Sequence, residues 1–344
     1  MKRQTIRVFY PNDRGRVVLR TEENWDVDVL PVSTNDSVWE FSIPTTRPFF
    51  YFKPLLVSDA GVQWSRGENY LATATFDTAA EVYPYFSEDT RCSVCELTPP
   101  LASPAGIEHH FRVFLPPGYH ENTLKRYPVL YMHDGNNLFL KQEAFLGNTW
   151  RTDEVLGVLD RMNVCEAVIA VGVHPRDRKR EYTLPGYEDY GRFLVEKLKP
   201  LIDAKYRTKI DAANTAAMGS SLGGVVSFYL GWQWPDVFGK VSCLSSTFGY
   251  RDDLIDRVRL EPKRAIKIYL DSGWQADNYE PTRAVRDRLI WKGYQPGSEL
   301  LYLAFPEAKH NENAWAERSP IPFQFLFGKL PKFRDSLRAP VKSS

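Results

Sequence analysis

This chain of 344 residues has few cysteines, no long apolar run and almost no excess of charge of either sign. Its 44 basic and 43 acidic residues leave a formal net charge of +1, so bulk electrostatics favour neither nucleic acid nor an anionic membrane surface. No apolar run is long enough to span a bilayer. The basic start, Met1 to Arg7, leads into no apolar core, so we expect no secretory signal and a cytoplasmic location, unless the numbering begins after a removed leader.

The four cysteines include one pair with metal-ligand spacing, Cys92 and Cys95, which is typical of a redox pair or of half a zinc site. No second pair follows, and Cys165 and Cys243 lie in apolar, strand-like runs. We therefore interpret the cysteines as buried or incidental thiols, and we expect neither a metal nor an organic cofactor.

A proline-rich stretch, Pro99 to Pro104, separates two regions with different patterns. The region before it is rich in aromatic residues and has no long helical period. Its strand-like runs, separated by turn-forming residues, are Thr5–Tyr10, Arg16–Arg20, Ser37–Ile43, Phe49–Val57 and Tyr70–Phe76. We predict a β-sandwich module over residues 1–98, followed by a linker over 99–106.

The region after the boundary alternates short apolar runs with helical patterns such as Tyr187–Tyr206 and Pro281–Lys292. The apolar runs are Tyr127–Met132, Ala167–Val173, Asn214–Met218, Lys240–Leu244, Ala265–Leu270 and Glu299–Phe305. This alternation is typical of βαβ units, and it predicts a doubly wound α/β domain over residues 107–344 with a mostly parallel sheet.

The motif Gly219-Ser-Ser221-Leu-Gly223 has the form Gly-x-Ser-x-Gly, between a predicted strand and an apolar helix over Val225–Trp234. A strand, a sharp turn and a helix form the nucleophile elbow of serine hydrolases, in which the serine hydroxyl is exposed by a strained backbone. A loop of glycine and serine without chemistry is the plainer alternative. The strand and helix around the motif favour Ser221 as a catalytic nucleophile.

A serine nucleophile needs a basic partner, and the base needs an acid to orient it. In this fold the chain order is serine, acid, histidine, each following a strand. His310 is the only histidine after Ser221, and it follows the predicted strand Glu299–Phe305. Two acids, Asp271 and Asp277, follow the strand before that one. We favour Asp277, which has room to reach the histidine, and keep Asp271 as the alternative.

The oxyanion of the reaction needs backbone N–H donors, one of which comes from the residue after the nucleophile, Leu222. The second is expected from the loop after Tyr127–Met132, where Gly135 permits a tight turn and Asn136 is the candidate donor. In the same loop, His133 and Asp134 have no evident third metal ligand, so we interpret them as structural.

Six of these runs, in this order, make the chain from about His110 to Gly328 resemble the esterase D family of α/β hydrolases. The runs are Phe114–Tyr119, Tyr127–Phe139, Arg178–Thr183, Gly219–Gly223, Asp271–Gly273 and His310–Trp315. Family members include feruloyl and acetylxylan esterases, S-formylglutathione hydrolases, enterochelin esterases and mycolyl transferases. The resemblance implies the triad Ser221, Asp277 and His310, although the spacing after the Asp271 strand is slightly longer than usual in the family and leaves Asp271 as an alternative.

The aromatic spacing of the first region, around Trp39, Tyr51 and Trp64, resembles the immunoglobulin-like early-set modules that precede glucan-active enzymes and enterochelin esterases. Substrate contacts are predicted from Trp150, Arg178 and Trp274 near strand ends, where an arginine suits a phenolate or carboxylate.

We therefore predict a serine esterase that forms an acyl-enzyme on an aryl, siderophore-like or sugar ester. It would act on a small molecule and bind neither nucleic acid nor membrane. The alternatives are an acyltransferase to a sugar or other alcohol, and a non-catalytic carbohydrate-binding protein on the same fold.

Overall fold

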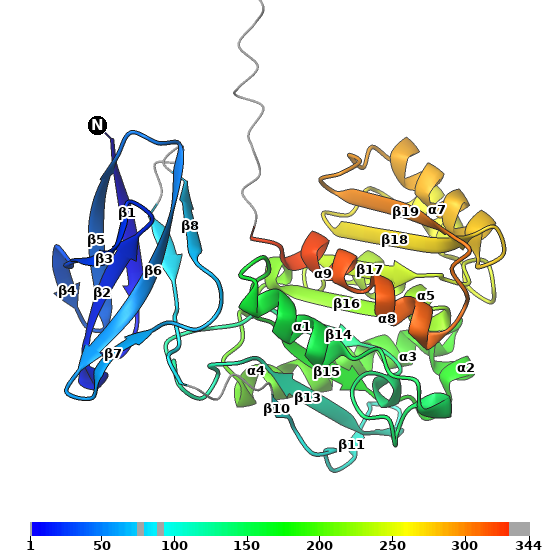
Figure 1. The fold of residues 1–344 in the computed structure, drawn as a ribbon. Helices are drawn as coiled ribbons and strands as arrows, with labels where there is room; N and C mark the ends of the chain where they lie inside the picture. Colours follow the sequence, from blue (N-terminus) through cyan, green and yellow to red (C-terminus); the bar gives the residue numbers. More distant parts are fainter. Residues whose placement is uncertain (1, 74–78, 88–92, 330–344) are drawn as a thin grey trace, which may run out of the picture.

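The computed structural model describes residues 2–73, 79–87 and 93–329. The end of the predicted strand Tyr70–Phe76 and the thiol of Cys92 therefore lie outside the described residues. No helix in these three ranges is long and apolar enough to cross a membrane. Figure 1 shows a β module and a larger α/β body.

The β module consists of two sheets with a shared core. One contains β4 (Ser33–Asn35), β5 (Val38–Thr45), β1 (Lys2–Phe9) and β9 (Ala80–Val82). The other contains β3 (Asn24–Val29), β2 (Arg16–Thr21), β6 (Phe49–Ser58), β7 (Gly61–Trp64) and β8 (Tyr70–Thr73). Alternate residues of β5, Trp39 and Phe41 among them, are buried against Leu19 and Phe52 of the opposite sheet. The β-sandwich prediction is confirmed.

The α/β body is built on one eight-stranded sheet with the order β10-β13-β15-β14-β16-β17-β18-β19. The strands from β14 to β19 pair in parallel, and β13 and β10 add an antiparallel edge. The strands are β10 (Ser93–Val94), β13 (Phe111–Leu115), β14 (Val129–Met132), β15 (Ile169–Val173), β16 (Thr215–Ser220), β17 (Lys240–Leu244), β18 (Lys267–Trp274) and β19 (Leu300–Pro306). This is the predicted doubly wound, mostly parallel sheet.

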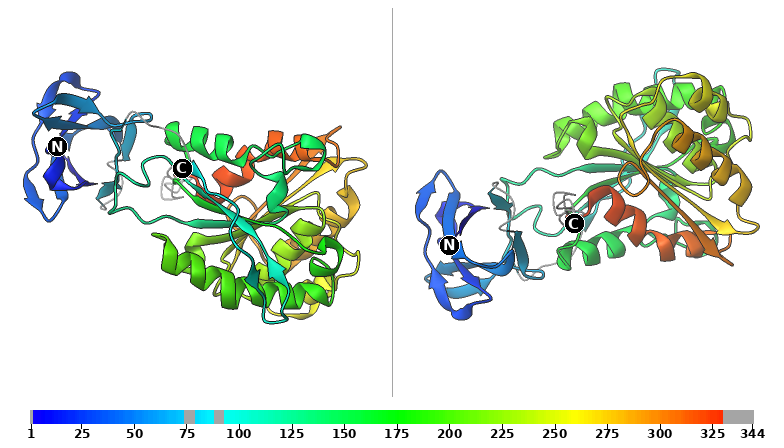
Figure 2. Two further views of the ribbon diagram at one scale, coloured as in Figure 1. Left: turned by 90° about the horizontal axis from the view of Figure 1, so that it is seen from below. Right: turned by 90° about the horizontal axis from the view of Figure 1, so that it is seen from above.

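Helices cover both faces of this sheet (Figures 1 and 2). One core lies between the sheet and α3 (Gly186–Phe193), α4 (Lys199–Lys205), α5 (Leu222–Gln233), α6 (Leu254–Leu260) and α7 (Tyr279–Trp291). The other lies under α1 (Thr152–Arg161), α8 (Glu312–Arg318) and α9 (Pro320–Phe327). Successive residues of β14 alternate between the two cores, because side chains along a strand point to opposite faces.

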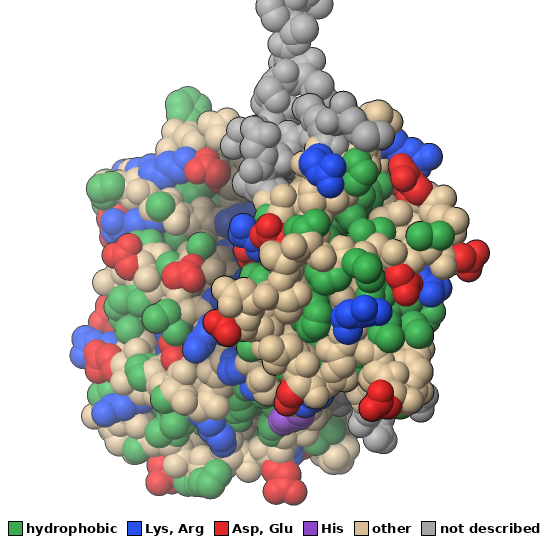
Figure 3. All heavy atoms as spheres, turned by 90° about the vertical axis from the view of Figure 1, so that its left-hand side faces the viewer, with side chains coloured by type: hydrophobic (Ala, Val, Ile, Leu, Met, Phe, Trp, Pro, Cys, Tyr) green, Lys and Arg blue, Asp and Glu red, His purple; other side chains and the backbone are tan. Residues whose placement is uncertain are grey.

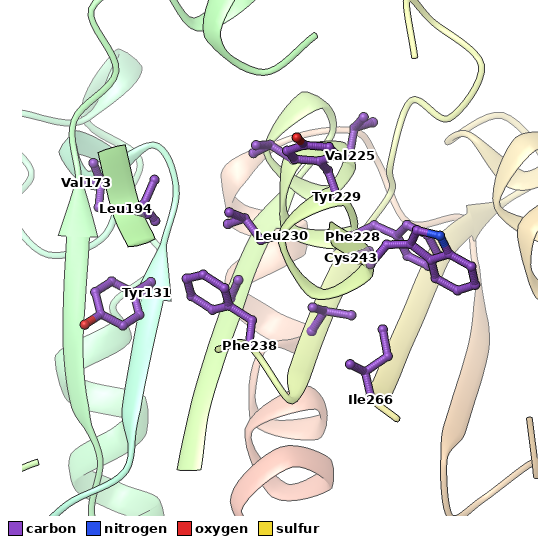
Figure 4. Packing of buried hydrophobic residues seen from close by; sticks show 14 of the residues in the cluster. Tyr131, Val173, Leu194, Val225, Phe228, Tyr229, Leu230, Phe238, Cys243 and Ile266 are labelled. Atoms are coloured by element: carbon purple, nitrogen blue, oxygen red, sulfur yellow. The ribbon is translucent and has the colours of Figure 1, made fainter. Parts of the chain in front are cut away.

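Helix α5 is apolar on all sides and buried over all but its last residue. Phe228, Tyr229 and Leu230 pack in the core shown in Figure 4, next to Cys243 of β17. The Tyr229 ring stacks on Tyr187 of α3 with the centroids 4.0 Å apart. A helix enclosed in this way has a fixed start, which matters because Ser221 immediately precedes it.

The predicted single helix Tyr187–Tyr206 is divided into α3, a π-helical turn over Leu194–Leu198 and α4. Pro200 lies at the start of α4, and its nitrogen has no hydrogen to donate to the preceding turn, so the regular ladder cannot continue. The pattern analysis also missed β13, an antiparallel strand outside the βαβ alternation.

The module is attached at the amino ends of the parallel strands. Asn122, which precedes β14, donates from Nδ2 to the carbonyls of Phe9 (2.9 Å) and Pro84 (2.8 Å). The carboxylate of Glu121 accepts hydrogen bonds from the Tyr10 hydroxyl, at 2.9 Å, and from backbone N–H groups of the module. Figure 2 shows the module at one end of the sheet.

The segment around the predicted boundary belongs in part to the larger body. Strand β10 pairs with β13, and β11 (Leu101–Ala102) forms a small hairpin with β12 (Glu108–His109). The ring of His109 is buried and stacks on Phe193 of α3. We propose that the boundary between the two units lies before Ser93, with residues 99–106 packed on the α/β body.

Candidate active site

Ser221 occupies the turn between β16 and α5 with φ 56° and ψ −122°. A positive φ outside glycine costs on the order of 1–3 kcal/mol, so the surrounding structure must hold it. The Ser221 N–H donates to the carbonyl of Leu244 in β17 at 2.9 Å. A Cβ on Gly219 would lie 2.6 Å from the carbonyl carbon of Gly223, so this turn closes only around glycine. The geometry is that of a nucleophile elbow.

His310 lies between the end of β19 and the start of α8. Its Nδ1 is 2.5 Å from Oδ1 of Asp277, which follows β18. The imidazole is 40% exposed, and its ring meets that of Trp315 edge to face at 4.9 Å. With Nδ1–H held by a carboxylate, Nε2 carries the free lone pair that a general base needs.

The other candidate acid, Asp271, lies in β18 and is fully buried. It pairs with the guanidinium of Arg318 at 3.1 Å and accepts a hydrogen bond from the Tyr269 hydroxyl at 3.0 Å. Burial raises the pKa of Asp271 to about 6, against the opposing charge of Arg318. The structure therefore brings Asp277 to His310 and keeps Asp271 away from it.

The carboxylate of Asp277 is surrounded by donors. Its Oδ2 accepts from Ser245 Oγ at 2.5 Å and from the Gly273 N–H at 3.0 Å, while Oδ1 faces His310. Burial acts to raise the pKa of Asp277, but the hydrogen bonds from His310, Ser245 and Gly273 outweigh it and hold the pKa below its usual value. This carboxylate is thus kept ionised beside the imidazole.

The two predicted oxyanion donors lie at neighbouring strand ends. Leu222 is the first residue of α5, and Asn136 lies in a 3₁₀ turn over Gly135–Asn137 after β14. Within the described residues, neither N–H donates a hydrogen bond to the protein. A Cβ on Gly135 would lie 2.5 Å from the backbone of Gly172 in β15, so glycine is required for this turn to pack on the sheet.

Arg178, predicted to contact substrate, is anchored beside the elbow. Its Nε donates to Asp134 at 2.7 Å, and Nη2 donates to the Ser220 carbonyl at 3.3 Å. His133 is buried with Nδ1 3.0 Å from the Tyr190 hydroxyl, and burial, aided by the charge of Arg178, lowers the pKa of His133 to about 3. Among the described residues no cluster of His, Cys, Asp and Glu could hold a metal ion.

The two tryptophans predicted as substrate contacts differ. Trp150 is only 3% exposed and packs with its ring centroid 6.0 Å from that of Trp315, so it lies in the core beneath the site and not on its surface. The loop before α1 turns this side chain inward, which residue type alone could not reveal. Trp274, at the end of β18, is half-exposed.

Three residues of this site escaped the sequence analysis: Ser245, Trp315 and Arg318. Ser245 follows β17 at the same edge of the sheet as the other strand-end residues, and that position is the signal that could have identified it. Trp315 was noted only within a family motif. Arg318 is buried, but no sequence signal distinguishes it from arginines that lie on the surface.

Several known proteins are similar to this chain. It is 22% identical over 245 residues to the uncharacterized protein YbbA of Bacillus subtilis (strain 168), which covers 64% of this chain and 92% of that protein. It is 24% identical over 273 residues to an endo-1,4-beta-xylanase/feruloyl esterase of Xylanibacter ruminicola, which covers 76% of this chain but 35% of that longer protein.

Among solved structures, a ferulic acid esterase superposes with a TM-score of 0.57 and 18% identity, covering 69% of this chain and 98% of that one. The enterobactin esterase FES from Shigella flexneri reaches a TM-score of 0.56 at 15% identity and covers 94% of this chain and 92% of that one, so the likeness includes the β module. The expected early-set module before an α/β-hydrolase fold is confirmed. Residues 103–317 match the model of the family described as "Putative esterase", and the chain belongs to that family.

Proposed function

We propose that this protein is a serine carboxylic ester hydrolase with the triad Ser221, His310 and Asp277. The observation that carries the proposal is the strained backbone of Ser221 at one strand end, together with an imidazole at another strand end whose Nδ1 is held by a carboxylate. The strained backbone at Ser221 lowers stability, and the hydrogen bond to Asp277 restricts the rotation of His310. Acyl transfer by a serine nucleophile is the chemistry that uses both features.

In this mechanism the hydroxyl of Ser221 attacks the ester carbonyl while Nε2 of His310 accepts its proton. Asp277 stabilises the imidazolium, and the N–H groups of Leu222 and Asn136 donate to the carbonyl oxygen as it becomes negative. When the tetrahedral intermediate collapses, His310 returns the proton to the leaving alcohol and an acyl-serine remains. Water, deprotonated by the same histidine, then releases the acid and restores the serine.

We propose that water, and not a second alcohol, accepts the acyl group, because the His310 ring is open to solvent. The reaction is then hydrolysis and not acyl transfer to an alcohol. The β module does not wall this site, since its contacts with the α/β body lie at the amino ends of the strands. Acceptor choice is therefore left to the loops at the carboxyl ends.

The substrate proposed is a small ester with an apolar or aromatic part. Phe145 and Leu146 are 64% and 81% exposed on the loop that follows the oxyanion turn. That loop is tied to the site, because Asn137 Oδ1 accepts from the Phe145 N–H at 2.9 Å and Asn148 bonds Asn313 of α8 at 3.3 Å. Solvated apolar side chains at a fixed loop favour contact with apolar ligand atoms. Two similar proteins are called ferulic acid and enterobactin esterases, which agrees with an aromatic ester.

The test combines a fluorophosphonate probe with assays on p-nitrophenyl acetate, methyl ferulate and a catecholate lactone. We expect the probe to label Ser221, and Ser221→Ala to lower kcat by roughly 10⁴-fold or more without unfolding the protein. Ser220→Ala removes the neighbouring buried hydroxyl and serves as the control. Labelling of Ser220, or full activity in Ser221→Ala, would contradict the proposal.

A further inference from the structure

The hydroxyl of Ser245 lies at the centre of a buried cluster behind the proposed triad. Ser245 follows β17, is fully buried and has a φ of 43°. Its Oγ is 2.5 Å from Oδ2 of Asp277 and 3.1 Å from Nε1 of Trp315, and it also contacts Nη2 of Arg318. Three side chains, one from the loop after β18 and two from α8, therefore converge on one oxygen atom.

The direction of the Ser245 proton follows from the identity of these partners. An indole N–H and a guanidinium can only donate, so Trp315 and Arg318 occupy the two lone pairs of the hydroxyl. The single O–H then has one acceptor left, which is the carboxylate of Asp277.

The charge of Arg318 is placed between two buried carboxylates. Nη2 lies 3.1 Å from Oδ1 of Asp271 and 3.5 Å from Oδ2 of Asp277, and Tyr269 donates its hydroxyl to Asp271. Trp315 and Arg318 are three residues apart on α8, so both reach inward from one helix face. The same helix begins two residues after His310, and it therefore positions both the base and the partners of its acid.

We propose that Ser245 is a positioning residue, which, oriented by Trp315 and Arg318, fixes the rotation of the Asp277 carboxylate so that Oδ1 faces His310. The inference rests on the proposed triad. Oδ2 is occupied by Ser245 and by the Gly273 N–H, and the carboxylate therefore cannot turn without breaking two hydrogen bonds. Ser245 touches neither substrate nor the reacting atoms, and it acts through Asp277 alone.

The chain offers a matched control for a test on the full-length protein. Ser246 is the next residue, is equally buried, and within the described residues its Oγ has no hydrogen-bond partner. Ser245→Ala and Ser246→Ala thus remove the same group from adjacent buried positions. For each variant we would measure kcat and KM on p-nitrophenyl acetate, urea unfolding, and the NMR resonance of the His310 Nδ1–H proton.

We expect Ser245→Ala to lower kcat by about tenfold or more with little change in KM, because a hydrogen bond to a charged group is lost. The Nδ1–H resonance should move upfield as the hydrogen bond to Asp277 loosens, while Ser246→Ala behaves like the wild type. Equal losses in both variants, or an unchanged rate and resonance in Ser245→Ala, would overturn the inference.

The two proposals can fail separately. If the wild type hydrolyses no ester, or Ser221→Ala is as active as the wild type, the proposed function fails. The NMR resonance needs no turnover, so it still decides whether Ser245 positions Asp277 against His310. An unchanged resonance then overturns the inference, and an upfield shift supports it.

Discussion

The two ends of the parallel sheet are built in different ways. At the carboxyl ends, Ser221 and Ser245 have strained backbone, and the buried charges of Asp271 and Arg318 pair with each other. Arg318 also donates to the Ser245 hydroxyl. At the amino ends, the β module is held by polar contacts to loops, with Glu121 as a main acceptor. The first end stores strain and charge, and the second only joins two folded units. The proposed chemistry and the attachment of the module are therefore separated by the length of the sheet.

The two ends also differ in how far their charged groups are removed from water. A cavity of about 770 Å³ lies at the amino ends, lined by residues of both units, and it is partly open to solvent. Burial lowers the pKa of Lys125 there to about 8, while the pair Lys209–Glu166 beside it stays half-exposed. At the carboxyl ends the charged pair of Asp271 and Arg318 is almost completely removed from water, which makes that end the costlier one to perturb.

The largest effect is expected from the two aspartates of the carboxyl end. Asp277→Asn should lower kcat by roughly 10⁴-fold, because the amide favours the wrong tautomer of His310. Asp271→Asn should instead cost about 3–5 kcal/mol of unfolding free energy, because Arg318 loses the charge of the nearer of its two buried carboxylates, with a smaller loss of kcat. Kinetics and urea unfolding of both variants check the pair. Abolished turnover in Asp271→Asn with mild loss in Asp277→Asn would reverse the assignment.

The next effect is on the pH dependence of stability. His133 has its pKa lowered from 6.5 to about 3, so the unfolded chain binds more protons between these values and stability falls as the pH falls through this window. The contribution is at most roughly 5 kcal/mol. We expect the urea midpoint of unfolding to fall less steeply with decreasing pH in His133→Gln than in the wild type, when both are measured at several pH values. Equal slopes for His133→Gln and the wild type would refute this account.

A smaller effect is expected where the module is attached. Asn122→Ala removes two buried hydrogen bonds to carbonyls of the module and should destabilise the junction by about 1–3 kcal/mol. Limited proteolysis between the units should become faster, while kcat/KM on p-nitrophenyl acetate stays unchanged because the site is at the other end of the sheet. A clear fall in kcat/KM would show that the two ends are coupled.

The smallest effect concerns the exposed loop beside the site. Replacing Phe145 and Leu146 by serine should raise KM severalfold for methyl ferulate and leave p-nitrophenyl acetate nearly unaffected, because only the larger ester reaches the loop. Leu260→Ser serves as the control, because Leu260 is exposed on α6 and the substitution changes polarity in a similar way. Equal changes in KM on both esters would remove the loop from the proposed substrate contacts.

Much of the fold was readable from local pattern. The run Lys240–Leu244 was predicted as a strand and is β17, because short apolar runs between turn signals mark buried parallel strands. Strand β18 extends four residues beyond the predicted Leu270, through Asp271 and Ser272. Polar residues end a strand in a pattern analysis, yet here Arg318 of a distant helix satisfies Asp271 and lets the strand continue.

The residues of the candidate site also fall into two groups: those that a sequence pattern predicts and those that only their neighbours in space reveal. Ser221 and His310 were predicted from a motif and a chain order, and their catalytic roles stay predictions. The structure places His310 beside Asp277. Ser245 and Arg318 carry no such order, since an isolated hydroxyl or guanidinium gains meaning only from neighbours in space. The inward turn of Trp150 likewise depends on packing against α8, which no local period encodes.

The place of the β module has a practical consequence for handling the protein. The module carries exposed apolar side chains, Phe49, Val62 and Trp64 among them, and green side chains stand out in the view from its side (Figure 3). Any surface that captures the molecule through this face would leave the opposite end of the sheet pointing outward. Immobilisation through a cysteine or tag introduced on the module should therefore preserve access for soluble esters, whereas coupling through α8 would block it.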